Sequence, residues 1–303
     1  MDPLLVITNN DAGAGTEEPL EQALAVMRER TSVEVAATSD PGELDSVLHR
    51  AGTRRIVVAG GDGSLHAVIA ALYRRHDLAK SVIGLLPLGT GNDFARGTGI
   101  PLDVEAAARV ILKNRPTPMD IIVDELGGIV VNSVHVGAGA QASRRGADWK
   151  DRLHSVGVGR ANLGKLGYPI GALLTAWKPP TLRLRVEIDG EVVNDLDSSV
   201  LMVALGNGSS VGGGTELTPV ADPSDGLMDV MISRATGPLG RLVYAARLGL
   251  GAHLESDDVQ YLRGKAVSIS GEAFWCSADG EINGPERQRT WHVEPAAYSM
   301  LLP

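Results

Sequence analysis

The stretch from Ile56 to Ser64 constrains the fold of this chain more than any other. Its first four residues are apolar and mostly β-branched, which indicates a buried strand, and three glycines around Asp62 then form a tight turn. Apolar residues recur at helical spacing from Leu65 onward, and Ser64 is a suitable N-cap. A strand, a glycine turn and a helix direct backbone N–H groups at one point, which suits a phosphate. A tight turn that binds nothing has the same pattern.

A second glycine-rich loop follows the next apolar run. Residues 82–86 read as a buried strand and lead into Pro-Leu-Gly-Thr-Gly-Asn-Asp-Phe-Ala-Arg at 87–96. The carboxyl ends of neighbouring parallel strands meet at one edge of a sheet, so two such loops would form one crevice. The pair of loops therefore strengthens the prediction of a phosphate site.

Together, the Gly-Gly-Asp-Gly-Ser and Gly-Thr-Gly-Asn-Asp motifs resemble those of the lipid-kinase superfamily of diacylglycerol kinases, sphingosine kinases and their bacterial relatives. The second motif is more similar to the diacylglycerol-kinase branch, and the resemblance covers nearly the whole chain. It implies ATP as co-substrate, Mg²⁺ as cofactor and transfer of the γ-phosphoryl group to a lipid hydroxyl. Diacylglycerol is the expected acceptor and phosphatidate the product, a step of phospholipid biosynthesis. A sphingoid base, another glycerolipid and a non-catalytic nucleotide- or lipid-binding regulator stay open as alternatives.

The resemblance assigns nucleotide binding to both glycine loops and to the first loop of the chain. Asn9 and Gly13 match the family's Asn-Pro-x-x-Gly opening, although Asn10 replaces the proline. Asp62 is expected to face magnesium or a hydroxyl, and the alternative is that it only caps the helix. The predicted nucleotide-binding residues are Asn9, Gly13, Gly60, Gly61, Asp62, Gly63, Ser64, Gly89, Thr90, Gly91, Asn92 and Asp93.

The pattern of elements predicts two domains. Strand-like and helix-like segments alternate up to Lys113, which indicates a parallel sheet with helices on both faces. After residues 116–120 the chain consists of short β-rich runs, with Asp189-Gly190 as a hairpin turn. We therefore expect a nucleotide-binding α/β domain at 1–120 and a mostly β domain for lipid and metal at 121–290. The resemblance implies that the second domain is a β-sandwich and that residues 291–303 return to the first.

Two groups of carboxylates in the second half are candidates for chemistry. Asp279-Gly280-Glu281 reads as a solvated hairpin, but the resemblance implies that Glu281 is the general base for the lipid hydroxyl and that Asp279 supports it or links to a metal. Residues 219–229 resemble the family's Pro-x-Ala-x-x-x-Asp-Gly-x-x-Asp segment. That resemblance implies a structural Mg²⁺ site with the Asp225 side chain and the Asp222 and Leu227 carbonyls, whereas a capped turn is the alternative.

A basic stretch between residues 144 and 165 is the predicted membrane contact, because it mixes cations with apolar residues in an otherwise acidic chain. The alternative is a solvated loop. Its candidate contact residues are Arg144, Arg145, Lys150 and Lys165. The net charge of −9 disfavours a nucleic-acid partner. A single cysteine and no leader or spanning run favour a cytoplasmic protein at the inner face of the membrane, and a homodimer stays open.

Two further glycine motifs are decoys. Residues 137–142 match a dinucleotide-binding turn, but no apolar helix follows and no acidic residue stands about 20 positions on. Residues 159–166 are one residue short of a P-loop, and Leu166 occupies the position of the magnesium-binding Ser or Thr. Neither motif favours a second nucleotide site.

Overall fold

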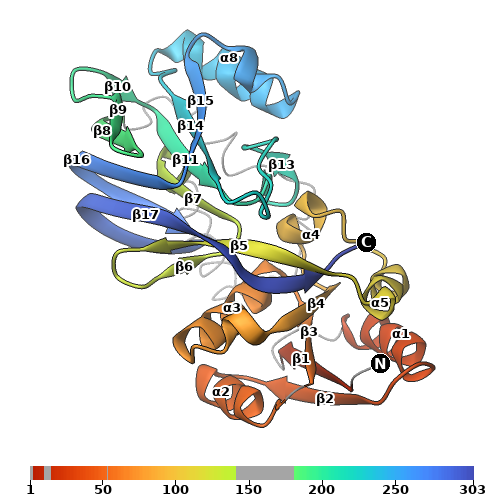
Figure 1. Cartoon of the computed structure of the whole chain (residues 1–303). Helices are drawn as coiled ribbons and strands as arrows, with labels where there is room; N and C mark the ends of the chain where they lie inside the picture. Colours follow the sequence, from red (N-terminus) through yellow and green to blue (C-terminus); the bar gives the residue numbers. More distant parts are fainter. Residues whose placement is uncertain (1–2, 10–14, 53, 141–180) are drawn as a thin grey trace, which may run out of the picture. The chain divides into compact units, whose positions relative to one another are not determined.

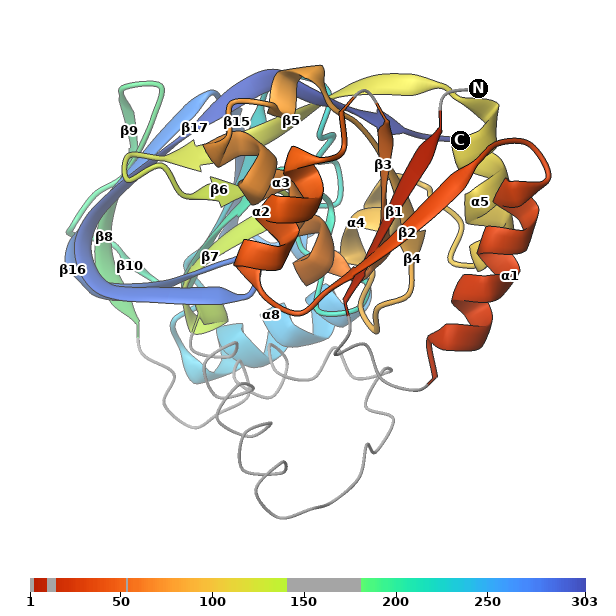
Figure 2. The same cartoon turned by 90° about the horizontal axis from the view of Figure 1, so that it is seen from below.

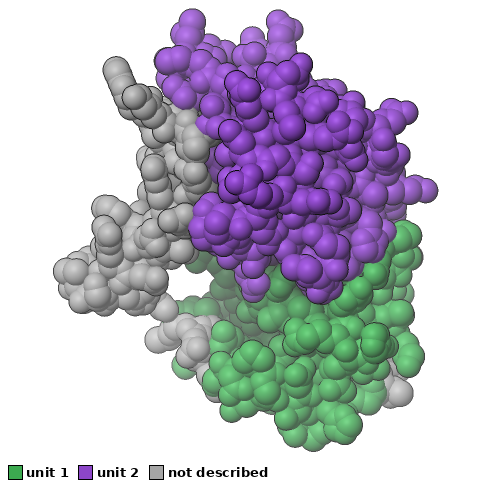
Figure 3. Space-filling model, turned by 90° about the vertical axis from the view of Figure 1, so that its left-hand side faces the viewer, with its two compact units in different colours: residues 1–121, 294–303 green, residues 122–293 purple. Residues whose placement is uncertain are grey.

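The computed structural model describes residues 3–9, 15–52, 54–140 and 181–303 of the chain (Figure 1). The chain divides into two compact units, residues 1–121 with 294–303 and residues 122–293 (Figure 3). Because the first unit contains both ends of the chain, two crossings join the units, at 121/122 and at 293/294.

The first unit is built on a parallel sheet with the strand order β17-β4-β3-β1-β2, in which every neighbouring pair is parallel. Its strands are β1 (Leu4–Asn9), β2 (Val33–Thr38), β3 (Arg55–Gly60), β4 (Val82–Pro87) and the end of β17 (Glu281–Leu301). Its helices are α1 (Glu17–Arg28), α2 (Pro41–His49), α3 (Asp62–Arg74), the 3₁₀ turn η1 (Leu78–Lys80), α4 (Asp93–Gly97) and α5 (Val104–Lys113). β5 (Pro116–Asp124) leads out of the unit.

Helices cover both faces of this sheet, as the alternating pattern predicts. Figure 2 shows α2 and α3 on one side of the strands and α1 with α5 on the other. The interior of β3 is buried throughout, which is why it reads as a continuous apolar run. α3 buries Leu65, Ile69 and Leu72 and packs on β3. Asp40 caps α2, since its carboxylate accepts the N–H groups of Gly42 and Glu43 at 2.8 and 3.0 Å.

The predicted start of the helix after the first glycine turn is wrong by three residues. α3 begins at Asp62, and Gly61 rather than Ser64 is its N-cap. The first helical hydrogen bond runs from Leu65 N to Gly61 O at 3.1 Å, so Ser64 already lies inside the first turn. A Cβ on Gly60 would lie 2.4 Å from Ser64 Oγ, which explains why this position needs glycine.

The second unit consists mainly of antiparallel strands in the order β15-β14-β11-β7-β16-β17, with β8 also pairing β16. Its elements are β6 (Ile129–Val130), β7 (Ser133–Gly137), β8 (Leu182–Ile188), β9 (Glu191–Asn194), β10 (Ser199–Val200), β11 (Met202–Gly206), β12 (Ser210–Val211), β13 (Thr215–Glu216), β14 (Met228–Ser233), α8 (Pro238–Gly249), η2 (His253–Glu255), β15 (Val259–Gly264), β16 (Ala266–Ala278) and most of β17. One core lies around Trp291 and Phe274, and another forms where Tyr244 of α8 packs on Met202 and Met231.

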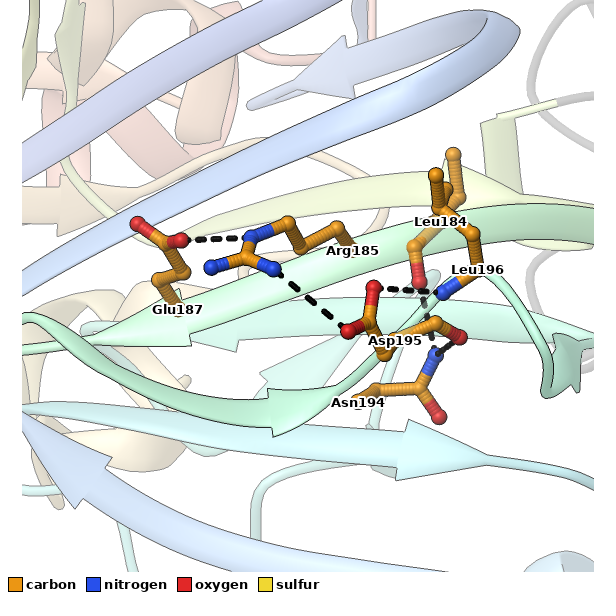
Figure 4. A network of polar contacts seen from close by, with 6 residues as sticks. All are labelled: Leu184, Arg185, Glu187, Asn194, Asp195 and Leu196. Carbon is orange, nitrogen blue, oxygen red and sulfur yellow. Dashed lines mark hydrogen bonds and ion pairs between the residues drawn. The ribbon is translucent and has the colours of Figure 1, made fainter.

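The β8–β9 hairpin shows how the alternating pattern acts in this unit. Leu184 and Ile188 of β8 are buried, whereas Arg185 and Glu187 point outward and form an ion pair at 2.6 Å. Arg185 also pairs with Asp195 at 3.4 Å, and Asn194 Nδ2 donates to Leu184 O (Figure 4). Asp189 and Gly190 make the predicted turn with φ values of 51° and 86°.

Candidate active site

The two glycine loops of the first unit lie against each other. β3 and β4 are in register with Gly60 opposite Pro87, so both loops leave the sheet at the same edge. A Cβ on Gly89 would lie 2.4 Å from the Gly61 Cα, and one on Gly61 would lie 2.9 Å from the Gly89 Cα. The two backbones therefore touch without side chains between them, which leaves room for a ligand to approach the loops closely.

Asp62 holds the second loop against the first helix. Its carboxylate accepts the backbone N–H groups of Asp93 and Phe94, both at 3.0 Å. These two N–H groups open α4, so the negative charge sits at the amino end of a helix turn. The position that the sequence assigns to magnesium or a hydroxyl is thus also a connection between the two loops.

Asn92 shapes the second loop from within. Its backbone is left-handed at φ 51°, and its Oδ1 accepts the Gly89 N–H at 3.0 Å. Its Nδ2 donates to Gly89 O at 2.7 Å. The side chain is therefore engaged inside the loop, while Thr90 at the tip is exposed.

Arg96 is a residue near this loop to which the motif analysis gave no role. It is exposed, and its Nε donates to Gly91 O at 3.0 Å, which places a guanidinium beside the loop. Gly63 is exposed at the start of α3, and Asn9 lies at the end of β1. Gly13 lies outside the described residues.

Asp279 and Gly280 form the tight turn between β16 and β17, with φ values of 47° and 93°. The Asp279 carboxylate accepts three successive backbone N–H groups, those of Val131, Asn132 and Ser133, at 2.6, 2.9 and 3.0 Å. Asp279 N also donates to Ser133 O at 2.9 Å. This turn is thus held by the segment before β7. Glu281 follows it, is exposed, and stands opposite Ala278 in the β16–β17 pairing.

Two polar residues of β7 that the sequence analysis did not single out lie next to this turn. Ser133 Oγ and His135 Nε2 are 3.3 Å apart and both residues are buried. Burial lowers the pKa of His135 to about 4, and the nearby Asp279 carboxylate raises it in part. His135 is therefore neutral at pH 7. Its signal in the sequence is one polar residue within an apolar strand.

The acidic loop before β14 is organised by its own carboxylates and by one arginine. Asp222 Oδ1 accepts from Ser224 N at 3.0 Å, and Asp225 Oδ1 accepts from Leu227 N at 3.0 Å. The other oxygen of Asp225 forms an ion pair with Arg263. Among the residues that the structure describes, no three His, Cys, Asp or Glu side chains are grouped to hold a metal ion.

Asp229 is the buried carboxylate of this loop. It is 0% exposed, and Arg263 Nε forms an ion pair with its Oδ1 at 3.4 Å. Burial raises the pKa of Asp229, while Tyr261 and Arg263 lower it. Asp229 is therefore a buried carboxylate whose charge Arg263 and Tyr261 offset in part.

The predicted membrane contacts Arg144, Arg145, Lys150 and Lys165 lie outside the described residues. Within the described ranges no helix is both long and apolar enough to cross a bilayer.

Comparisons with known proteins agree for the two halves of the chain. Residues 3–123 match the diacylglycerol kinase catalytic domain, and residues 130–302 match the YegS C-terminal NAD kinase beta sandwich-like domain. The chain is 31% identical over 245 residues to the "Probable lipid kinase YegS-like" protein of Serratia proteamaculans, covering 80% of this chain and 76% of that one. It is 32% identical over 235 residues to the protein of that name from Chromohalobacter salexigens, covering 76% and 70%.

A solved structure supports the fold. A diacylglycerol kinase from Bacillus anthracis superposes with a TM-score of 0.75 at 21% identity and covers 100% of this chain and 97% of that one. The predicted fold class, a parallel α/β domain followed by a β-sandwich, is confirmed.

Proposed function

The chain belongs to the family of YegS-like lipid kinases, and we propose that it transfers the γ-phosphoryl group of ATP to the hydroxyl of diacylglycerol, giving phosphatidate. The observation that carries the nucleotide part is the contact between the Gly61 and Gly89 backbones, with Asp62 bridging to the N–H groups of Asp93 and Phe94. Such an arrangement holds two glycine turns together at one edge of the sheet, where phosphates can approach the backbone closely.

In this proposal the residues of the two loops bind the ATP phosphates. The residues with this role are Asn9, Gly13, Gly60, Gly61, Gly63, Ser64, Gly89, Thr90, Gly91 and Asp93, with Asp62 and Asn92 holding the loops in shape. Arg96 is suited to add a guanidinium to the phosphates, because Arg pairs with phosphate oxygens through two N–H donors.

Glu281 is proposed as the general base that takes the proton from the acceptor hydroxyl. It is exposed, so a substrate hydroxyl can reach it, and it directly follows a turn that Asp279 anchors with three hydrogen bonds. Asp279 is therefore proposed as a positioning residue. A base held within hydrogen-bond reach of a hydroxyl contributes roughly 10²–10⁴-fold to the rate.

A divalent cation is proposed at the acidic loop, held by the Asp225 side chain and by the carbonyls of Asp222 and Leu227. The clustering of Asp222, Asp225 and Asp229 around the turn at Gly226 supports this assignment. Magnesium bound with ATP would neutralise phosphate charge during transfer. Peripheral contact with an anionic membrane surface on the cytoplasmic side is proposed for Arg144, Arg145, Lys150 and Lys165, since a lipid acceptor must be met at an interface.

The test is a phosphorylation assay with labelled ATP and Mg²⁺ in mixed micelles. Diacylglycerol, monoacylglycerol, phosphatidylglycerol and sphingosine are offered separately at equal mole fraction. We expect diacylglycerol to give the largest kcat/KM. If phosphatidylglycerol or sphingosine is preferred, the acceptor assignment is wrong while the kinase assignment stands.

A further inference from the structure

A basic pocket of about 370 Å³ lies in the first unit, away from the glycine loops. It is lined by the first residues of β3 and β4, Arg55 and Val82, and by the ends of α2 and α3. The glycine loops leave the other ends of the same strands, at Gly60 and Pro87. A strand of six residues spans about 17 Å, so the pocket is separate from the proposed ATP site.

The pocket combines an apolar floor with a cationic wall. Leu48, Ile56 and Leu72 are buried side chains that line it. Four of the lining residues are cations, namely Arg54, Arg55, Arg75 and Lys80, and only Asp77 among them is acidic. Such a concentration is unusual in a chain whose net charge is −9.

Neighbouring groups hold two of the arginines in place. Arg54 forms an ion pair with Glu34, outside the pocket lining, and its Nε donates to Ala51 O at 2.8 Å. Arg75 Nε lies 3.4 Å from Asp77 Oδ2. Even with Glu34 and Asp77 set against the four cations, the pocket keeps an excess of two positive charges. Because its Nη2 also donates to Arg50 O, Arg54 contributes its charge to the pocket, whereas Arg75, which Asp77 holds in place, is positioned before any ligand arrives.

We propose that this pocket binds a small phosphate-bearing anion. Guanidinium groups suit phosphate oxygens through paired N–H donors, and the exposed Lys80 ammonium adds a mobile point charge. The volume is at the lower end of small-molecule sites and suits a diphosphate or a phosphorylated headgroup. The apolar floor accommodates the carbon atoms of such a ligand. The source of the phosphate is either a free phosphate compound or a phospholipid headgroup.

The experiment is calorimetric titration of the full chain with two probes, pyrophosphate and dioctanoyl phosphatidate. Mg²⁺ and a saturating non-hydrolysable ATP analogue are present to occupy the proposed nucleotide site. Lys80→Gln and Arg55→Gln each remove one pocket charge. Lys113→Gln is the matched control, because this exposed lysine ends α5 in the same unit and does not line the pocket.

We expect at least one probe to bind, with affinity about tenfold weaker in Lys80→Gln and in Arg55→Gln and unchanged in Lys113→Gln. Pyrophosphate binding identifies a free phosphate compound as the source, and binding of phosphatidate alone identifies a headgroup. The proposal is overturned if neither probe binds, or if Lys80→Gln and Lys113→Gln bind alike. Should Arg55→Gln fail to fold, the exposed Lys80 decides the result. The readout is binding, so it is independent of the kinase assay.

Discussion

Asp62 and Asp279 make the same kind of contact in different surroundings. Each carboxylate accepts successive backbone N–H groups of a distant segment, two for Asp62 and three for Asp279. Asp62 occupies a helical turn and binds the loop after the adjacent strand, whereas Asp279 occupies a left-handed turn and binds a segment almost 150 residues earlier. The comparison shows that a carboxylate that accepts successive backbone N–H groups can connect the loops of two neighbouring parallel strands, as Asp62 does. The same contact can also hold a hairpin turn against a segment that is distant in sequence, as Asp279 does.

The largest expected effect is on kcat, and it comes from Glu281, the residue that the Asp279 turn positions. Glu281→Gln keeps the size of the side chain but cannot accept a proton, so kcat should fall about 10²–10⁴-fold. ATP affinity and the melting temperature should not change, because Glu281 is exposed. Steady-state kinetics measures kcat, and calorimetry measures the ATP affinity and the melting temperature. Full activity of Glu281→Gln would mean that the proton leaves by another route.

Asp279→Ala tests the turn itself. It leaves three N–H groups without their acceptor and puts alanine at φ 47°, so the free energy of unfolding should fall by about 3 kcal/mol. Asp279→Asn is the matched control, since Asn tolerates this φ and keeps the acceptor for Asn132 and Ser133. The free energy of unfolding measured in urea should be highest for the unaltered chain, lower for Asp279→Asn and lowest for Asp279→Ala. Equal loss in both variants would show that charge, rather than geometry, holds the turn.

Asp62→Ala should lower the free energy of unfolding less than Asp279→Ala does, by about 2 kcal/mol, because two N–H groups instead of three lose their acceptor. If the loop must then order on binding, ATP affinity falls by about 30-fold, the same free energy. Titration with ATP measures this, and Asp62→Asn, which keeps one acceptor oxygen, should be intermediate. Unchanged ATP affinity in Asp62→Ala would show that the two loops do not form the nucleotide site.

The Asp279 turn has a titratable neighbour, which gives a pH test. Burial lowers the pKa of folded His135 from 6.5 to about 4, so the unfolded chain binds more protons between these values. The contribution of His135 to the free energy of unfolding is therefore fully present above pH 6.5 and is lost as the pH falls towards 4. We expect a decrease of about 1 kcal/mol between pH 7 and 5.5.

His135→Gln should flatten this slope, whereas the exposed His49→Gln should not. Part of the slope should remain, since burial also lowers the pKa of His253. Urea unfolding at several pH values is the measurement, and an unaltered slope in His135→Gln would contradict the assignment.

The smallest contribution is expected from an aspartate that pairs with a side chain as well as with a backbone N–H. Arg263→Gln removes the ion-pair partner of the partly exposed Asp225, a pair that we expect to contribute about 1 kcal/mol to the free energy of unfolding without Mg²⁺. The buried Asp229 loses the same partner, which adds to the decrease. Mg²⁺ should then raise the melting temperature more than in the unaltered chain, because the guanidinium no longer competes. Adding Asp225→Ala should abolish that response. An identical Mg²⁺ response in all three proteins would place the cation elsewhere.

The parts of this fold that could be predicted are those encoded by neighbouring residues. The alternation of apolar strands and amphipathic helices predicts the parallel sheet, and Asp189-Gly190 predicts its hairpin because only left-handed residues fit there. Ser64 misleads as an N-cap because Gly61 in extended conformation starts the helix earlier. The partners of Asp279 and the Arg263–Asp225 pair could not be predicted, since they depend on strand pairings between segments far apart in sequence.

The end of β17 has a consequence for fragments of this protein. Ser299 and Met300 pair with Val82 and Ile83 of β4, and Ala296 N donates to Asp120 at 2.7 Å. A fragment that stops at residue 121 would therefore leave the β4 edge with open N–H and C=O groups, which invites strand exchange and aggregation between copies. A soluble fragment of the first unit would need residues 294–303 grafted after residue 121 through a linker, so that the missing edge strand is restored in the same chain.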